Sequence, residues 1–168
     1  MNRRIFTPAF VALFLAGSAV TGPAFAADDT MVREIDVAID LPAITNPAAA
    51  QRYTNIADDL KEAIAARLVD RLSDEGVKIS VDISEVELSS SFTEAVGAAD
   101  TRLVGAVNIT DEKDNSNFKS FELTVNVNQA KLFFPAELDI TTLSASSDDF
   151  YRSMIAAFAD GVVTKLDE

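Results

Sequence analysis

Apolar and polar residues alternate in four separate runs of this chain, and a period of two is typical of half-buried β-strands. We therefore predict four strands, which cover Ile35 to Leu41, Val77 to Ile83, Leu103 to Ile109 and Phe121 to Val127. After Ser84 the apolar residues change parity, since Val86 and Leu88 fall on the opposite face. A shift by one residue turns side chains to the other face, so we expect a β-bulge or a strand end at Ser84–Glu85.

Two further segments repeat their apolar residues with the period of an α-helix. The first is predicted to start at Asn46–Pro47, a good N-cap and first-turn pair, and to run to about Glu75 before Gly76. Its apolar stripe is Ile56, Leu60, Ile64, Leu68 and Leu72. The second follows the capping residues of 146–149, and its stripe is Phe150, Met154, Phe158, Val162 and Leu166.

The resulting order is β-α-β-β-β-α, which predicts an α+β fold made of two layers. Each strand has one apolar face, so both helices should cover that face of a four-stranded mixed sheet and leave the other face to water. The first crossover should be right-handed and join parallel strands, whereas the later strands should be antiparallel. The order of strands in the sheet stays open. No linker or repeat divides residues 27–168, so we expect a single domain.

Residues 1–26 have the pattern of a cleavable signal peptide. Arg3 and Arg4 precede an apolar run from Ile5 to Val20, and Ala24-Phe25-Ala26 places small residues before the expected cut. The run is too short and interrupted for a membrane span. The start resembles a twin-arginine signal, but a paired arginine is a weak motif and we favour the general secretory route. The mature protein is expected in the periplasm or medium, without stable membrane insertion.

The composition excludes several chemistries. The chain has no Cys and no His, so disulfides, a lipid-attachment Cys and the usual zinc or redox-metal ligands are missing. Its net charge of −13, with bases scattered singly among acids, argues against nucleic-acid binding. We expect no cofactor and assign no catalytic residue, because the commonest general base and the best nucleophile are absent.

Three local patterns contain residue types that could carry chemistry. Ser116 and Lys119 have a Ser-x-x-Lys spacing, but at a hairpin tip rather than on a helix turn. Oxygen donors crowd the preceding turn, where a calcium site is conceivable, although polar turn residues explain the composition equally well; the candidate ligands are Asp111, Asp114, Asn115 and Asn117. Acid pairs at Asp58–Asp59 and Glu85/Glu87 could serve a hydrolase, but Asp58 and Asp59 are read as solvating charges on an exposed helix side.

The segment Leu132-Phe133-Phe134 is the best candidate for contacts with a partner. Contiguous apolar residues at a strand end cannot all face one core. One interpretation places Phe133 or Phe134 as a plug at the open end of the sandwich under the last helix. The other makes the segment a docking patch together with Phe92.

The middle of the chain resembles small bacterial envelope modules: the amino-terminal domain of TolB-type proteins and the auxiliary lipoproteins of ABC transporters. The resemblance rests on the helix from Ile56 to Leu72, Gly76, a strand, and Leu103-Val104-Gly105-Ala106-Val107 before a polar hairpin. It implies a non-enzymatic adaptor with a protein partner in the cell envelope. The alternatives are a carboxylate-based hydrolase and a carrier of a small apolar ligand, which would need a cavity between helices and sheet.

Overall fold

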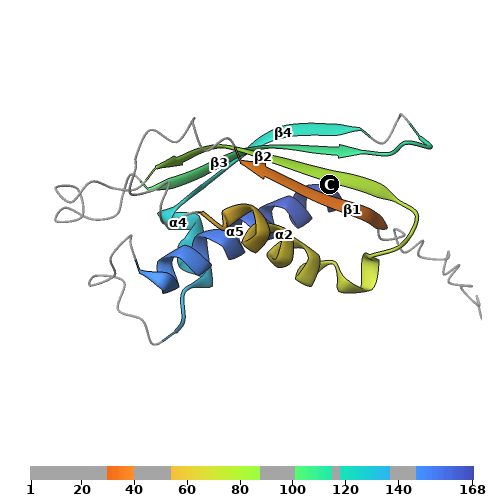
Figure 1. Cartoon of the computed structure of the whole chain (residues 1–168). Coiled ribbons are helices and arrows are strands. Elements are labelled where there is room, and N and C mark those ends of the chain that lie inside the picture. Colours follow the sequence, from red (N-terminus) through yellow and green to blue (C-terminus); the bar gives the residue numbers. More distant parts are fainter. Residues whose placement is uncertain (1–29, 40–53, 88–100, 115–117, 137–146) are drawn as a thin grey trace, which may run out of the picture.

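The computed structural model describes residues 30–39, 54–87, 101–114, 118–136 and 147–168, and its elements form two layers (Figure 1). One layer is a sheet of β1 (Val32–Ile39), β2 (Val77–Glu87), β3 (Arg102–Thr110) and β4 (Lys119–Asn126) in the order β1-β2-β3-β4. Strands β1 and β2 are parallel, and the other neighbouring pairs are antiparallel. The predicted mixed sheet is confirmed, and the order that the sequence left open is now defined.

The second layer consists of α2 (Ile56–Arg67) and α5 (Asp148–Asp167), which lie side by side under one face of the sheet (Figure 1). The apolar stripes of both helices and of all four strands meet between the layers. This core contains the fully buried side chains of Ile56, Leu60, Ile64, Ile79, Ile83, Leu103, Phe150 and Phe158. The predicted α+β sandwich with both helices on one face is therefore confirmed.

The register of the sheet confirms the irregularity expected near Ser84. Ile83 pairs with Gly105, but Glu85 pairs with Val104, so one residue of β2 has no partner position. A second irregularity lies between Val32 and Glu34 in β1. Bulges of this kind bend a strand and increase its local twist.

Within the described residues, the first helix is shorter than predicted, so its predicted extent is wrong. Thr54 and Asn55 form a turn before Ile56, and the helix ends at Arg67 rather than near Glu75. After a 3-10 turn, η2 (Val69–Arg71), Leu72 forms a bridge to Val32 and is 46% exposed instead of lying in the buried stripe. The chain has to turn there because it must enter β2 beside the start of β1. The predicted start at Asn46–Pro47 lies outside the described residues.

The fourth strand also ends one residue earlier than predicted. Val127 begins a short helix, α4 (Val127–Ala130), which continues into the 3-10 turn η3 (Lys131–Phe133). Asn126 causes the change, because its side chain accepts hydrogen bonds from the backbone amides of Asn128 (2.9 Å) and Gln129 (3.3 Å). The Gln129 side chain accepts in return from the Asn126 amide at 2.8 Å, which completes a capping box.

Both ends of α5 are capped. At the start, the Ser147 hydroxyl accepts from the Phe150 amide at 3.2 Å, which confirms the predicted cap. At the end, the Lys119 ammonium donates to the carbonyls of Lys165 (3.2 Å) and Leu166 (3.1 Å). A cation at a helix C-terminus satisfies free carbonyls and complements the dipole. No helix in the described part of the chain is long and apolar enough to span a membrane.

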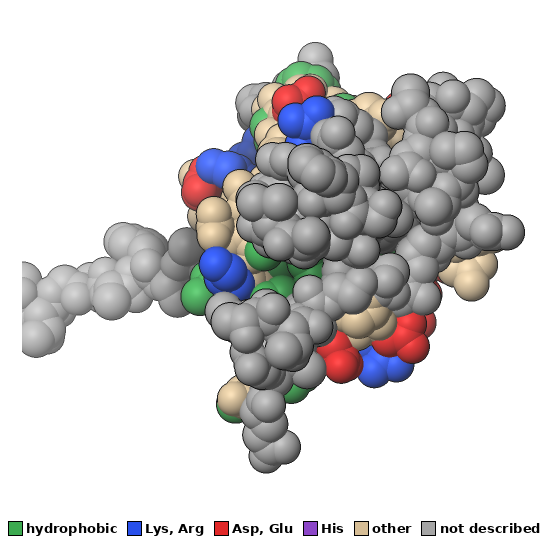
Figure 2. Space-filling model, turned by 90° about the vertical axis from the view of Figure 1, so that its left-hand side faces the viewer, with side chains coloured by type: hydrophobic (Ala, Val, Ile, Leu, Met, Phe, Trp, Pro, Cys, Tyr) green, Lys and Arg blue, Asp and Glu red, His purple; other side chains and the backbone are tan. Residues whose placement is uncertain are grey.

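The outer face of the sheet is polar and carries paired charges. The Lys78 ammonium lies 2.7 Å from a Glu34 carboxylate oxygen and 3.6 Å from Asp36. At the end of the domain drawn in Figure 2, the described acidic side chains lie beside basic ones, and a further basic side chain lies beside apolar ones. Exposed pairs of this kind contribute little to stability and are screened by salt.

Substitution of Glu34 by Gln is expected to lower stability slightly at neutral pH and to leave it unchanged in strong acid. The hydrogen bond from Lys78 lowers the pKa of Glu34 below its ordinary value, and the same pair raises the pKa of Lys78. A lowered carboxyl pKa contributes stability above the unfolded-state pKa, and this is lost as pH falls through the folded-state value. The raised Lys78 pKa contributes below the unfolded lysine value and is lost as pH rises through the folded one.

Urea unfolding of wild type and Glu34→Gln across the acid range measures this effect. The difference between the two proteins should shrink as the pH falls below the carboxyl range. Asp82→Asn is the matched control, since Asp82 on β2 is an exposed carboxylate on the same outer face of the sheet as Glu34. A difference that persists unchanged into strong acid would contradict the ion pair as its cause.

Candidate functional site

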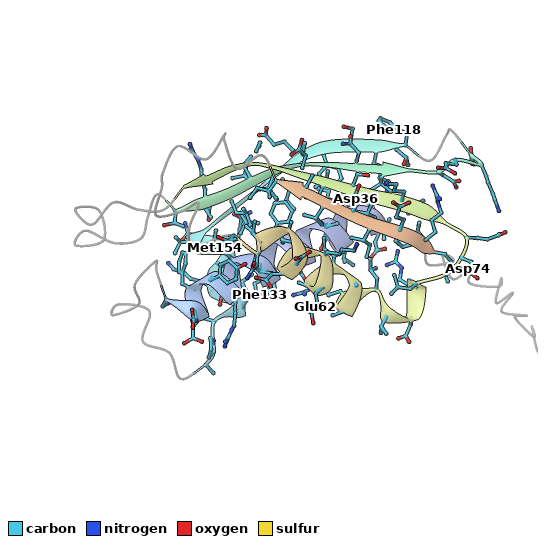
Figure 3. All side chains as sticks on the ribbon, in the orientation of Figure 1. Asp36, Glu62, Asp74, Phe118, Phe133 and Met154 are labelled. Atoms are coloured by element: carbon cyan, nitrogen blue, oxygen red, sulfur yellow. The ribbon has the colours of Figure 1, made fainter. Side chains whose placement is uncertain are left out.

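An open groove runs along the seam between α2 and α5, on the side of the helix layer that faces away from the sheet. It has a volume of about 480 Å³ and is lined by Asp59, Glu62, Ala63, Ala66, Arg67, Asp148, Tyr151, Arg152, Ile155 and Ala156. We call it the helix-pair groove. Glu62 is part of this lining, and Figure 3 shows it on α2 pointing away from the sheet.

Small side chains make the floor of the helix-pair groove. Ala63 and Ala66 come from α2, and Ala156 comes from α5, next to the buried Ile155. Alanine fills little space above the backbone, so the seam between two packed helices stays hollow where alanines from both sides meet. The floor is therefore apolar, while charged residues stand at its rims.

Polar side chains tie the two helices together along the seam. The Tyr151 hydroxyl donates to the Asp59 carboxylate near the start of both helices. Further along, the Arg67 guanidinium donates to the carbonyl oxygens of Ala63 at 3.0 Å and of Ala156 at 2.9 Å. Later residues of α2 thus bind later residues of α5, so the two helices run in the same direction. The same hydrogen bonds hold the two walls of the groove together.

A third tie closes the far end of the seam. The Arg71 guanidinium donates to Asp167 at 2.7 Å and to the Thr30 carbonyl at 2.9 Å, which joins η2, the end of α5 and the chain that enters β1. Its second terminal nitrogen is buried without a hydrogen-bond partner in the described part of the chain. Arg71 is thus a structural clamp at one end of the groove.

The lining of the helix-pair groove includes three acids and two bases. Asp59, Glu62 and Asp148 are acidic, and Arg67 and Arg152 are basic. Arg67 is already engaged, because it binds two carbonyls, lies 4.0 Å from Asp160 and stands over the Phe133 ring at 6.0 Å. Arg152 is 4.0 Å from Asp149, on its own helix.

The predicted contact segment lies on the turn after α4. Leu132 is 85% exposed, whereas Phe133 and Phe134 are half-buried against the core. The Phe134 ring lies 6.1 Å from Phe150, and the Ser153 hydroxyl donates to the Phe133 carbonyl at 3.2 Å. The two phenylalanines therefore pack against the core, and Leu132 is the residue of the three that faces solvent. The docking role of this segment stays a prediction. Phe92 lies outside the described residues.

The calcium candidate is only partly described. Asp111 and Asp114 are in the β3–β4 turn, while Asn115 and Asn117 lie outside the described residues. The Asp111 carboxylate accepts from the amides of Lys113 (2.8 Å) and Asp114 (3.3 Å), which is how an Asx turn is built. Within the described ranges, no group of three acids is placed to hold a metal ion. The calcium site stays a prediction.

The other candidate residues for chemistry either have a structural role or lie outside the described part of the chain. Lys119 caps α5, so in this arrangement it serves the fold; Ser116 is not described, and neither are the side chains of Glu85 and Glu87. Lys113, 2.8 Å from Glu75, lowers the pKa of that carboxyl, as Lys78 lowers that of Glu34. Both shifts run opposite to the raised pKa that an acid catalyst needs.

The helix-pair groove was missed in the sequence because it depends on pairs of residues far apart in the chain. The sequence pattern predicts a solvating charge at Asp59, but this side chain is half-buried and bound to Tyr151. The available clue was the run of alanines at Ala63, Ala65 and Ala66, opposite which a second helix with Ala156 and Ala157 can approach closely.

Comparison with known proteins supports the fold. No family model matches the sequence, and no curated protein matches it. Among solved structures, protein XCC0632 of Xanthomonas campestris, from the DUF330 family, is similar, with a TM-score of 0.50 and 12% identity over 87% of this chain and 89% of that one. A PelC variant from Paraburkholderia phytofirmans, solved as a dodecamer, gives a TM-score of 0.47 and 14% identity over 86% and 91%.

The similarity to XCC0632 concerns architecture. At such identities a shared fold does not carry a shared function. The resemblance to TolB-type and ABC-transporter modules stays a prediction, beside the finding that small bacterial proteins of this architecture exist.

Proposed function

We propose that the protein is an exported, non-enzymatic binding or adaptor protein of the cell envelope, and that the helix-pair groove is its contact surface. The observation that carries this proposal is an open groove of about 480 Å³ with an apolar floor, outside a closed core. Apolar surface that the fold leaves open at a rigid hollow is a feature of partner-binding sites. The export pattern of residues 1–26 supports the compartment.

The groove favours a macromolecular partner over a small apolar ligand. A carrier would hold its ligand between the helices and the sheet. In this protein, that space is filled by core side chains such as Ile64, Ile79 and Phe158, which are fully buried. Small-molecule sites usually enclose most of the ligand surface. The helix-pair groove instead faces solvent along its length, as a site for a segment of another protein does.

The hydrolase alternative finds no specific support. It needs two acids around a scissile bond, one of them with a raised pKa. Asp59 in the groove is held by the Tyr151 hydroxyl, and its neighbour Asp58 is exposed on a different side of α2. We therefore keep binding as the function and leave hydrolysis as the alternative.

Site-specific photo-crosslinking in the cell envelope tests the proposal. The full chain is expressed in a bacterium with a photoreactive amino acid at position 66 in the groove, at Leu132, or at Ser80 on the outer sheet face. We expect a periplasmic protein that begins at Ala27, and a crosslinked partner from positions 66 and 132. The reason is that both positions lie on the exposed helix side of the domain.

Ser80 is the control, because β2 presents it on the opposite, polar face. Crosslinks that are equally strong from Ser80, or absent from both helix-side positions, would contradict the proposed surface. A protein that keeps residues 1–26 and stays in the cytoplasm would contradict the compartment.

A further inference from the structure

We infer that the occupant of the helix-pair groove is a basic amphipathic helix of a partner protein. This inference rests on the proposed binding function and specifies the partner's chemistry. The partner's small or medium apolar side chains would lie on the alanine floor, and its Lys or Arg side chains would meet the acidic rims. The structure offers three features for this: the shape of the groove, its charge and its rigidity.

The shape fits a third helix. Two packed helices with small facing residues leave a furrow along their seam, and a third helix can lie in such a furrow with its ridges against both. Ala63 and Ala66 on one wall and Ala156 on the other allow close approach. A helix that binds this way presents apolar residues at every third or fourth position, which is the helix-in-groove mode of recognition.

The charge selects a basic partner. Glu62 stands at the mouth of the groove, and within the described residues no Lys or Arg lies within ion-pair distance of it. Arg67 is turned into the seam by two carbonyls, so its charge is directed at the protein's own backbone. The lining holds one more acid than base, and the whole chain has a net charge of −13. A net negative charge raises the encounter rate with a cationic partner.

The rigidity lowers the cost of binding. The ties from Tyr151 to Asp59 and from Arg67 to Ala156 hold both walls before any partner arrives. Pre-formed surfaces lose less conformational entropy on association, so affinity rises without new contacts.

A pair of model peptides tests the inference. One is a helix of about 18 residues with leucine and alanine on one face and lysine on the other; its twin has glutamate in place of lysine. Fluorescence anisotropy measures binding of each peptide to the mature protein at physiological salt. We expect the lysine peptide to bind and the glutamate peptide not to bind.

Three variants separate the groove from general attraction to an acidic protein. Ala66→Trp fills the floor without a change of charge, and Glu62→Lys reverses the free rim charge; each should weaken binding of the lysine peptide by about 10-fold. Asp82→Lys makes the same change of charge as Glu62→Lys, but on the outer sheet face. It should leave the affinity within about twofold, since bulk charge alone contributes only screened attraction. Circular dichroism confirms that each variant is folded.

Five outcomes would overturn the inference. Four concern the peptides: equal weakening by Asp82→Lys, no weakening by Ala66→Trp, equal binding of the glutamate peptide, and no binding of either peptide. The fifth is a dimer in light scattering that Ala66→Trp dissociates, which would identify a second copy as the occupant. If the peptides fail while position 66 still crosslinks a protein in the envelope, only the partner chemistry is wrong; if both fail, the proposed function is wrong.

Discussion

Replacement of Phe158 by alanine is expected to lower the free energy of unfolding by about 4 kcal/mol, a large part of a single domain's stability. Phe158 lies in the middle of α5, is 0% exposed and belongs to the apolar cluster between the layers. Removal of its ring takes away buried apolar surface and leaves a cavity that packed neighbours cannot fill. Urea unfolding followed by circular dichroism measures the loss.

Phe118→Ala is the matched control, because it removes the same ring from a position that is 57% exposed. Its effect should stay within about 0.5 kcal/mol, as is usual for surface substitutions. A loss at Phe158 no larger than that at Phe118 would mean that the helix layer is not packed on the sheet as described.

The position of Phe158 also explains a glycine that the strand pattern alone does not. Gly105 interrupts the apolar alternation of β3, and glycine is unfavourable within a strand. A Cβ atom built there would lie 3.0 Å from Phe158 Cζ and 3.0 Å from Ile83 Cδ1. The aromatic ring of α5 therefore packs directly over the strand backbone, which brings the helix layer close to the sheet.

The layers and the element order could be predicted because they follow from local periodicity. Alternation every second residue identified all four strands, and the change of parity at Ser84 identified the bulge. The boundaries could not be predicted in the same way. Leu72 fits the helical stripe, but tertiary pairing with Val32 moves it into a bridge; Val127 fits the strand, but the Asn126 cap starts a helix.

The helix-pair groove could be predicted least of all. Its walls are joined by Asp59 with Tyr151 and by Arg67 with Ala156, pairs that are separated by 92 and 89 positions in the chain. A single sequence shows each residue's own preference and says little about which distant residue it will meet. The sequence singles out the segment Leu132-Phe133-Phe134 because three contiguous apolar residues violate strand alternation, which is again a local property.

Replacement of Gly76 by alanine is expected to cost about 3 kcal/mol, because both the backbone angle and the space oppose a side chain there. Gly76 has φ of 126°, a region that L-residues rarely adopt. Its Cβ would lie 2.2 Å from the carbonyl oxygen of Met31 and 2.5 Å from the carbonyl carbon. That carbonyl accepts from the Val77 amide at 2.9 Å at the start of the β1–β2 pairing, so neither segment can move away without loss of the hydrogen bond.

Gly161→Ala makes the same chemical change in α5 and should lie within about 1 kcal/mol of wild type, because alanine favours a helix interior. Its Cβ would meet only the Leu123 side chain, at 3.0 Å, and a side-chain end can shift by a few tenths of an ångström. Urea unfolding of both variants measures the contrast. A Gly76 variant as stable as the Gly161 variant would show that the turn into β2 is looser than its contacts indicate.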